Sequence, residues 1–397
     1  MEPTNETTTE SSDTRPFKRS RFLEPSPLPS AGDLAILHVK RDVITPVILS
    51  TSTTTGYAEG AVTNTRFGSF PHSRLLSSPW GSQIRASKVD TGSRGRGKTP
   101  TTATEPVDAA AGFIHLLPPT PETWTLSLSH RTQVVYTPDY SYVLGRMEVR
   151  PGGRVMEAGA GSGSFTHAAA RAVYGPGGRV YSFDFHEPRV EALRKEIEEH
   201  GLEEVVEVRE RDVCTDGFEP VRNKVEAVFL DMPAPWLAIR HLNRGDATPL
   251  DPEVPVQLCV FVPCIEQVTA TVETLRTSGW SEVDVVEVQH KRIEVRRERI
   301  GIHNEGLRGV NSSPANVDEA LTRLREIEKN NVPSKAARLE RLRQEASERK
   351  VYEDGELVHA PEPELKSHTA YLVFAVLLPH LDEDAEMVSV ALELDGN

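Results

Sequence analysis

A glycine-rich segment, residues 155–165, constrains the fold of this chain more than any other feature. It reads Val-Met-Glu-Ala-Gly-Ala-Gly-Ser-Gly-Ser-Phe, with glycines at the alternate positions 159, 161 and 163. An apolar pair opens it, and a helix-forming run over residues 164–173 follows. Glycine lets the backbone turn sharply and approach a ligand because it has no Cβ, and the start of a helix presents unpaired N–H groups. The segment therefore predicts a strand, a nucleotide-type cofactor loop and a helix.

The spacing of these glycines helps to choose the cofactor. Dinucleotide-binding loops follow the pattern G-x-G-x-x-G, whereas this loop reads G-x-G-x-G, with Ser164 where that pattern has its third glycine. Glu157, just before the loop, would face a pyrophosphate unfavourably but would favour a cation. S-adenosylmethionine carries a sulfonium and an ammonium and no phosphate, so we expect it here. A plain tight turn and an NAD-linked oxidoreductase are the alternatives.

Alternating strands and helices continue after the loop. Apolar runs predict strands over 179–184, 205–213, 227–231, 258–262, 282–288 and 371–378, and 3.6-residue periodicity predicts helices over 188–200 and 265–278. This alternation predicts an α/β fold with a doubly wound, Rossmann-like sheet. Ligands of such sheets bind beyond the carboxyl ends of the strands. Asp184, Asp212 and Asp231 all fall at those ends, and Asp184 is suited to accept hydrogen bonds from both ribose hydroxyls.

Composition argues against several classes of protein. No uninterrupted apolar run reaches about 18 residues, so we expect no transmembrane helix, and the first residues lack the apolar core of a secretory signal. The cysteines, Cys214, Cys259 and Cys264, lack C-x-x-C spacing. We therefore expect no disulfide framework, no metal site and a reducing compartment, cytosol or nucleus.

The charge of the chain bears on its partners. The net charge is −14, and the acidic excess lies after residue 150, because residues 1–150 carry 16 Lys/Arg and 14 Asp/Glu. Such a surface would repel a phosphate-rich substrate. Either the substrate is not a nucleic acid, or another subunit supplies positive surface.

Composition also suggests the domain boundaries. We expect a disordered tail over 1–30, a small N-terminal β domain over 31–112 and the cofactor domain over 113–397. A basic insertion, 85–110, interrupts the first domain, and a charged helical insertion, 301–365, interrupts the second, with helices over 318–329 and 334–352. A basic cluster at 15–21 is either a nuclear address or a solvated part of the tail.

Several motifs outside the glycine loop are more specific. They are His-Arg-Thr-Gln-Val-Val-Tyr-Thr-Pro-Asp at 130–139, Phe-Leu-Asp-Met-Pro-Ala-Pro-Trp at 229–236 and Cys-Ile-Glu-Gln at 264–267, with supporting segments at 67–73, 119–126 and 368–372. In this combination the chain closely resembles the catalytic subunits of tRNA (adenine-N1-)-methyltransferases, which methylate adenosine 58 of the T loop. The likeness covers about 32–84, 113–300 and the final strand. It implies a class I methyltransferase domain that binds S-adenosylmethionine.

The resemblance also implies roles for individual residues. Ser162, Gly163, Ser164 and Phe165 would wrap the methionine and ribose, Asp184 would replace the more usual glutamate, and Asp212 with Val213 would bracket the adenine. With the loop residues, the candidate cofactor contacts are Val135, Glu157, Gly159, Gly161, Ser162, Gly163, Ser164, Phe165, Asp184, Arg189, Asp212, Val213 and Asp231. Glu157 could instead hydrogen-bond the N–H groups of the loop.

Asp231 matches the catalytic aspartate of that family. N1 of adenine already has a lone pair, so methylation needs no general base. A carboxylate that accepts the exocyclic amino hydrogen would hold the base and stabilise the developing positive charge. A carboxylate that only caps a turn is the alternative. Candidate substrate contacts are Gln133, Tyr136, Pro233 and Trp236, although Tyr136 could equally be a packed aromatic residue.

The resemblance further implies partners. The family's catalytic subunit pairs with a non-catalytic, tRNA-binding subunit in a heterotetramer of two plus two, which would supply the missing basic surface, and we expect a nuclear protein. A non-catalytic scaffold resembling that partner is the second hypothesis for the chain, and the NAD-linked oxidoreductase is the third.

Overall fold

The computed structural model describes residues 18–40, 43–52, 57, 59–88, 107–128, 134–218, 221, 224–245, 248–289, 293–298, 316–329, 344, 356–361 and 370–379. The chain divides into two compact units. The first comprises residues 1–288 and 369–397, and the second comprises residues 289–368.

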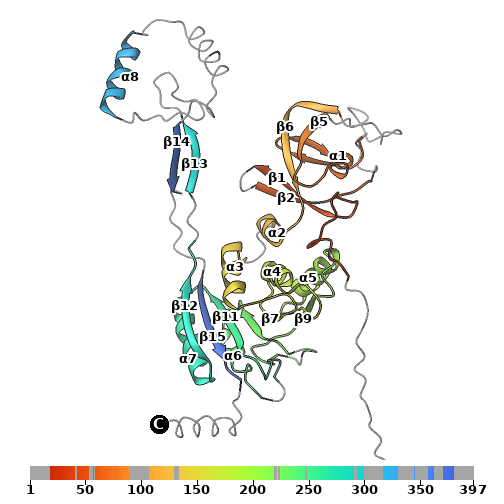
Figure 1. Ribbon diagram of the computed structural model, residues 1–397, viewed down its shortest axis with the longest axis vertical. Coiled ribbons are helices and arrows are strands. Elements are labelled where there is room, and N and C mark those ends of the chain that lie inside the picture. Colours follow the sequence, from red (N-terminus) through yellow and green to blue (C-terminus); the bar gives the residue numbers. More distant parts are fainter. Residues whose placement is uncertain are drawn as a thin grey trace, which may run out of the picture. The chain divides into compact units, whose positions relative to one another are not determined.

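A six-stranded sheet begins the first unit (Figure 1). Its strand order is β2-β1-β6-β5-β4-β3, and every adjacent pair is antiparallel. The strands are β1 (Leu34–Lys40), β2 (Val43–Ile48), β3 (Val62–Thr65), β4 (Gly68–Pro71), β5 (Gln83–Lys88) and β6 (Val107–Leu117). Helix α1 (His72–Leu76) and one face of this sheet bury a small core that includes Leu37, Phe70 and Ile114. The sheet extends to Leu117, beyond the boundary at residue 112 that the sequence suggests.

Part of the predicted N-terminal tail is packed. We expected disorder over residues 1–30, but Phe22 is only 2% exposed and stacks on His200 with 4.6 Å between ring centroids. It also meets Trp124 of helix α2 (Pro121–Ser127) edge-on. The hydroxyl of Ser20 donates a hydrogen bond to the carbonyl of His200. The prediction was wrong for this part of the tail, because one aromatic side chain gains enough from burial to fix a segment of polar composition.

A seven-stranded sheet forms the rest of the first unit. Its order is β12-β15-β11-β10-β7-β8-β9. The strands are β7 (Arg154–Ala158), β8 (Arg179–Asp184), β9 (Val206–Glu210), β10 (Ala227–Leu230), β11 (Val256–Val262), β12 (Ser281–Glu287) and β15 (Tyr371–Leu377). The five strands from β7 to β11 are parallel, and β15 runs antiparallel to both β11 and β12.

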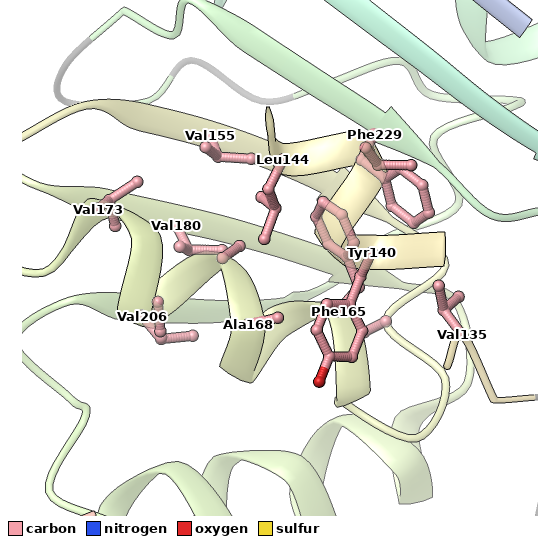
Figure 2. Packing of buried hydrophobic residues seen from close by; sticks show 14 of the residues in the cluster. Val135, Tyr140, Leu144, Val155, Phe165, Ala168, Val173, Val180, Val206 and Phe229 are labelled. Carbon is pink, nitrogen blue, oxygen red and sulfur yellow. The ribbon is translucent and has the colours of Figure 1, made fainter. Parts of the chain in front are cut away.

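Successive residues of a strand point to opposite sides of the sheet, so the apolar strands present two apolar faces. Helices cover both of these faces. On one side, Val155 and Phe229 join a core with helices α3 (Thr137–Arg146), α4 (Ser164–Val173) and α5 (Glu187–Glu199). Figure 2 shows this packing, in which the rings of Phe165 and Phe229 stack 3.8 Å apart. On the other side, Met156 and Val228 pack with helices α6 (Pro235–Ile239) and α7 (Ile265–Thr277). The predicted doubly wound, Rossmann-like fold is confirmed.

The second unit is an insertion between β12 and β15. Antiparallel neighbours leave and re-enter a sheet at the same end, so the insertion does not interrupt the pairing of these two strands. It contains an antiparallel pair, β13 (Ile293–Glu298) and β14 (Glu356–Pro361), and helix α8 (Val317–Lys329). Helix α8 confirms the helix predicted over 318–329. The helix predicted over 334–352 lies outside the described residues apart from Gln344, and so does most of the basic insertion. None of the described helices combines the length and apolar character needed to span a membrane.

Candidate active site

The glycine loop connects β7 to α4 in a conformation that other residues rarely adopt. Gly159, Gly161 and Gly163 have φ angles of 91°, 54° and 77°. A Cβ on Gly159 would lie 1.9 Å from the backbone carbonyl oxygen of Asp231, so only glycine fits there without a shift. The loop thus passes directly over the end of β10. Glycine is required both for the backbone path and for the contact between the loop and Asp231.

A cavity of about 520 Å³ opens beside this loop. It is lined by Gly159, Gly161, Phe183, Asp184, Phe185, Arg189, Arg211, Asp212, Val213, Cys214, Asp231, Met232, Pro233 and Ala234. A small recess shares the two glycines and Asp231 with this cavity and adds Val135, Glu157, Ala160, Ser162, Ser164 and Phe165. Of the predicted cofactor contacts, only Gly163 lines neither space. Residues from sequence segments far apart therefore meet at the carboxyl edge of the parallel strands.

Gly163 instead is the N-cap residue of helix α4, and its carbonyl accepts a hydrogen bond from a buried histidine. The Nδ1–H of His167 donates a hydrogen bond of 2.7 Å to the Gly163 carbonyl, and the Nε2 of His167 lies 2.8 Å from the Nδ1 of His200. Both rings are buried among Phe22 and Trp124. Burial lowers the pKa of His167 to about 3 and that of His200 to about 4, so both are neutral at physiological pH. The histidine pair links the end of the loop to the N-terminal segment.

Asp184 is preorganised at the end of β8. Its Oδ2 accepts a hydrogen bond from the Gly161 N–H (3.1 Å), and its Oδ1 accepts from the His186 N–H (2.9 Å) and from Arg189 (2.8 Å). These donors fix the orientation of the carboxylate beside the loop. Asp184 and Arg189 both line the cavity; the sequence predicts that Asp184 contacts the ribose and that Arg189 is a further cofactor contact.

Glu157 is a buried acid without a cationic partner among the described residues. Its Oε2 accepts hydrogen bonds from the hydroxyls of Thr166 (2.6 Å) and Ser182 (2.8 Å), so its partners are these side chains rather than the loop N–H groups. Burial, reinforced by the charges of Asp231 and Asp184, raises the pKa of Glu157 to about 8 even though the two hydroxyls lower it. A positively charged ligand in the recess would stabilise the ionised form of Glu157.

Asp231 follows β10 directly. Its backbone N–H donates to the Ala158 carbonyl (2.9 Å), which ties it to the strand that enters the loop. Among the described residues, no group donates a hydrogen bond to its carboxylate, which disfavours the alternative of a turn cap. Burial and the charge of Asp184 raise the pKa of Asp231 to about 7. The carboxylate is therefore available to a ligand that carries positive charge or hydrogen-bond donors.

The expected adenine side of the cavity contains Asp212 and Val213. The carboxylate of Asp212 accepts from the Cys214 N–H (3.0 Å) and from the Thr215 hydroxyl (2.8 Å). The hydrogen bond from Thr215 lowers the pKa of Asp212 and keeps it ionised. Val213 is buried in the core that also contains Met156 and Val228. Asp212 thus stabilises its own turn and keeps lone pairs free for a further donor.

The predicted substrate contacts are more scattered. Pro233 lines the cavity, and its carbonyl accepts a hydrogen bond of 2.8 Å from the side chain of Gln267. The side-chain oxygen of Gln267 also accepts a hydrogen bond from the Cys264 N–H at the start of α7. Gln267 therefore connects the motif at 264–267 with the motif at 229–236. Tyr136 caps the start of α3, and Trp236 lies in α6; both are partly buried and neither lines the cavity. Gln133 lies outside the described residues.

Several residues that line the cavity were not predicted from the sequence. Phe185, Cys214 and Met232 each follow a predicted contact in the chain, so adjacency to a strand-end residue was the signal that could have found them. Phe185 is 66% exposed, and the guanidinium of Arg189 lies 5.4 Å from its ring centroid. No cluster of three or more His, Cys, Asp or Glu side chains suited to a metal occurs in the described part of the chain.

These features fit S-adenosylmethionine better than a dinucleotide. The loop allows a ligand to approach closely, and Asp184 is suited to bind a ribose. The two acids with raised pKa values, Glu157 and Asp231, favour a positively charged ligand, whereas a pyrophosphate is negatively charged. The fold and the site therefore define a class I methyltransferase that uses S-adenosylmethionine.

Comparison with known proteins gives the family. The model of the tRNA methyltransferase complex GCD14 subunit matches residues 112–377, and this chain belongs to that family. The tRNA (adenine(58)-N(1))-methyltransferase catalytic subunit trm61 of Aspergillus fumigatus is 46% identical over 92% of this chain and 89% of its own length. The corresponding subunit of Schizosaccharomyces pombe is 34% identical over 88% and 93%. The resemblance seen in the sequence motifs is confirmed.

Solved structures agree on the fold. The tRNA (m1A58) methyltransferase TrmI of Aquifex aeolicus has a TM-score of 0.54 at 16% identity and covers 89% of this chain and 100% of that one. A SAM-dependent O-methyltransferase of Thermotoga maritima has a TM-score of 0.58 at 20% identity and covers 90% and 97%.

Proposed function

We propose that this chain transfers a methyl group from S-adenosylmethionine to N1 of adenosine 58 in the T loop of tRNA. The observation that carries the proposal is Asp231, which lines the cavity beside the glycine loop and whose carboxylate accepts no hydrogen bond from any described residue. Family membership supports the substrate, because the similar subunits are named for that reaction.

The residues of the cavity divide the binding of the cofactor among them. When bound, S-adenosylmethionine supplies an electrophilic methyl group on a positively charged sulfur. Asp184, fixed by Gly161 and Arg189, would accept the ribose hydroxyls. Val213 would pack against the adenine, and Asp212 would accept from its amino group. Glu157 and Asp231 would compensate the positive charge in the recess.

Asp231 has the further task of holding the target base. N1 of adenine attacks with its own lone pair, so no residue has to remove a proton. The Asp231 carboxylate would accept the exocyclic amino hydrogen and stabilise the positive charge that grows on the ring. Pro233 and Trp236 would shape the wall beside a base rotated out of its loop, with Gln133 and Tyr136 as further contacts.

The proposal includes a partner. With a net charge of −14, this chain offers little of the basic surface on which nucleic-acid affinity depends. A basic, tRNA-binding, non-catalytic subunit would provide it, in a heterotetramer of two chains of each kind. We also propose a nuclear location, with the basic cluster at 15–21 as the address; a fluorescent fusion that stays nuclear after this cluster is neutralised would assign the address elsewhere.

A catalytically inactive scaffold is the second candidate. The intact glycines, Asp184 and Asp231 argue against it, since a scaffold has no need for a carboxylate that, within the described part of the chain, has no hydrogen-bond donor. The NAD-linked alternative loses its support, because the family uses S-adenosylmethionine and the third glycine of the dinucleotide loop is absent.

The deciding experiment measures methylated nucleosides directly. The chain is co-expressed with its partner subunit and incubated with unmodified tRNA and S-adenosylmethionine, and the T-loop nucleosides are then analysed by mass spectrometry. We expect 1-methyladenosine at position 58 with the native complex and little with an Asp231→Ala complex of equal purity. Equal methylation by both complexes would refute the role of Asp231, and none by either would favour the scaffold.

A further inference from the structure

One exposed region of the N-terminal sheet consists of planar side chains. By register, His38 of β1 lies opposite His115 of β6, His115 lies opposite Gln83 of β5, and Arg85 of β5 lies opposite Phe113 of β6. Directly paired residues of antiparallel strands point to the same side. These five residues therefore form one continuous surface across three strands, here called the His115 face.

This surface is open, and the opposite side of the same strands is filled. Phe113 is 47% exposed, Gln83 and Arg85 are exposed, and the two histidines are partly exposed. The alternate residues Ile84, Ile114 and Leu116 are buried in the small core. The His115 face thus contributes little to that core. Phe113 is not an isolated exposed ring, because it lies in one cluster with two histidines, an arginine and a glutamine.

The rings of the His115 face lie close to one another. Phe113 and His115 meet edge-on with 5.6 Å between centroids, and His38 and His115 lie 6.0 Å apart. The guanidinium of Arg85 and the amide of Gln83 are also planar and bring hydrogen-bond donors. None of the five residues of this face carries a carboxylate, and Asp108 of β6, which pairs with Ser87 beyond a register shift, is already ion-paired with Arg74. In a chain with an acidic excess, this acid-free surface is complementary to an anionic ligand.

We propose that the His115 face binds unpaired nucleotides of the RNA substrate. Phe113 and His115 would stack on bases, as aromatic side chains on exposed sheets can do. Arg85 would contact a phosphate, and Gln83 would offer its amide to a base edge. The inference rests on the proposed function for the identity of the RNA, but it concerns a surface separate from the cofactor cavity. A protein partner on the same surface is the competing occupant.

The test uses the co-expressed complex and varies the ring at position 113. Phe113→Leu keeps apolar bulk but removes the stacking plane, whereas Phe113→Trp enlarges it. We expect Phe113→Ala and Phe113→Leu to raise the KM for tRNA roughly 5- to 100-fold, the range for loss of one stacked base. Phe113→Trp should stay near the native value. The affinity for S-adenosylmethionine and kcat at saturating tRNA should not change in any of them.

Charge is tested separately. Arg85→Ala should reduce the slope of log KM against log salt by about one, the value for one lost phosphate contact. Arg276→Ala, an exposed arginine of α7, is the matched control and should leave both KM and slope unchanged.

Three outcomes would overturn the proposal: Phe113→Leu behaving as the native complex, Arg276→Ala matching Arg85→Ala, or Phe113 variants losing the partner subunit, which would make the surface a protein interface. Fluorescence anisotropy with a labelled single-stranded RNA, without cofactor, separates this proposal from the reaction. If the native complex fails to methylate but Phe113→Leu still weakens RNA binding, the proposed function fails and the His115 face stands.

Discussion

The raised pKa of Asp231 predicts that cofactor affinity depends on pH near neutrality. In the structure this pKa is about 7, because the carboxylate is largely enclosed and faces the charge of Asp184. At about one pH unit below that value, only roughly a tenth of the molecules carry the ionised group. A cationic ligand prefers the ionised form, so binding at lower pH must first release a proton.

The magnitude follows from linkage. Below the pKa of Asp231, protonation of this residue should weaken S-adenosylmethionine binding by a factor of about ten for each pH unit, and this contribution should level off above that pKa. Asp231→Asn cannot ionise and should therefore lower the slope of log Kd against pH by about one. Glu157, with a pKa of about 8, can add to the slope in the native protein. Glu157→Gln measures that contribution independently.

Calorimetric titration between about pH 5.5 and about pH 7.5 provides the assay, because the cofactor's own amino group stays largely protonated there. Repeating it in buffers of different ionisation enthalpy counts the protons released. S-adenosylhomocysteine, which lacks the sulfonium charge, is the ligand control and should show a weaker dependence. A native affinity that is flat over this range, or an Asp231→Asn slope equal to the native one, would refute the reasoning.

The remaining predictions concern turnover, the loop and acid stability. Asp231→Ala and Asp231→Asn should both lose roughly 10² to 10³ in kcat at saturating cofactor, the scale for one preorganised electrostatic contact; an Asn variant as active as the native enzyme would show that charge is not the contribution. Gly159→Ala should abolish cofactor binding in titrations, because its Cβ would lie 1.9 Å from the Asp231 carbonyl oxygen, and unchanged affinity would contradict that geometry. His167 and His200 have pKa values of about 3 and 4 in the folded protein, below the ordinary 6.5. The unfolded chain therefore binds more protons, and the stability of the fold should fall as the pH drops from 6.5 toward these folded-state values. In thermal melts at several pH values, His200→Asn should flatten this slope, and an unaltered slope would assign acid sensitivity to other groups.

The sequence predicted the centre of the fold well because local and global signals agree there. Helix α4 and strand β8 have the expected bounds, since glycine and apolar periodicity mark both of them. Asp184 and Asp231 were predicted because acids at the carboxyl ends of buried strands lie where ligands of such sheets bind. For the same physical reason both of them line the cavity.

Other features depend on partners that are distant in the chain. Phe22 sits in a polar segment, and nothing near it shows that Trp124 and His200 form a place for its ring. Phe185 looked like an ordinary residue after a strand, and its position on the cavity depends on how β8 ends. The His115 face arises only when three strands pair in one register, which no local pattern specifies.

The placement of β15 has a consequence for how the protein is made. This strand comes from residues 371–377 but pairs with β11 on one side and β12 on the other. During synthesis, both neighbours are complete long before it appears, with the edges that should receive it unpaired. Exposed edges of this kind favour association with other chains. The sheet can close only when the last strand emerges, so a transcript truncated just before residue 371 would yield an aggregation-prone fragment although every residue of the cofactor cavity had been translated.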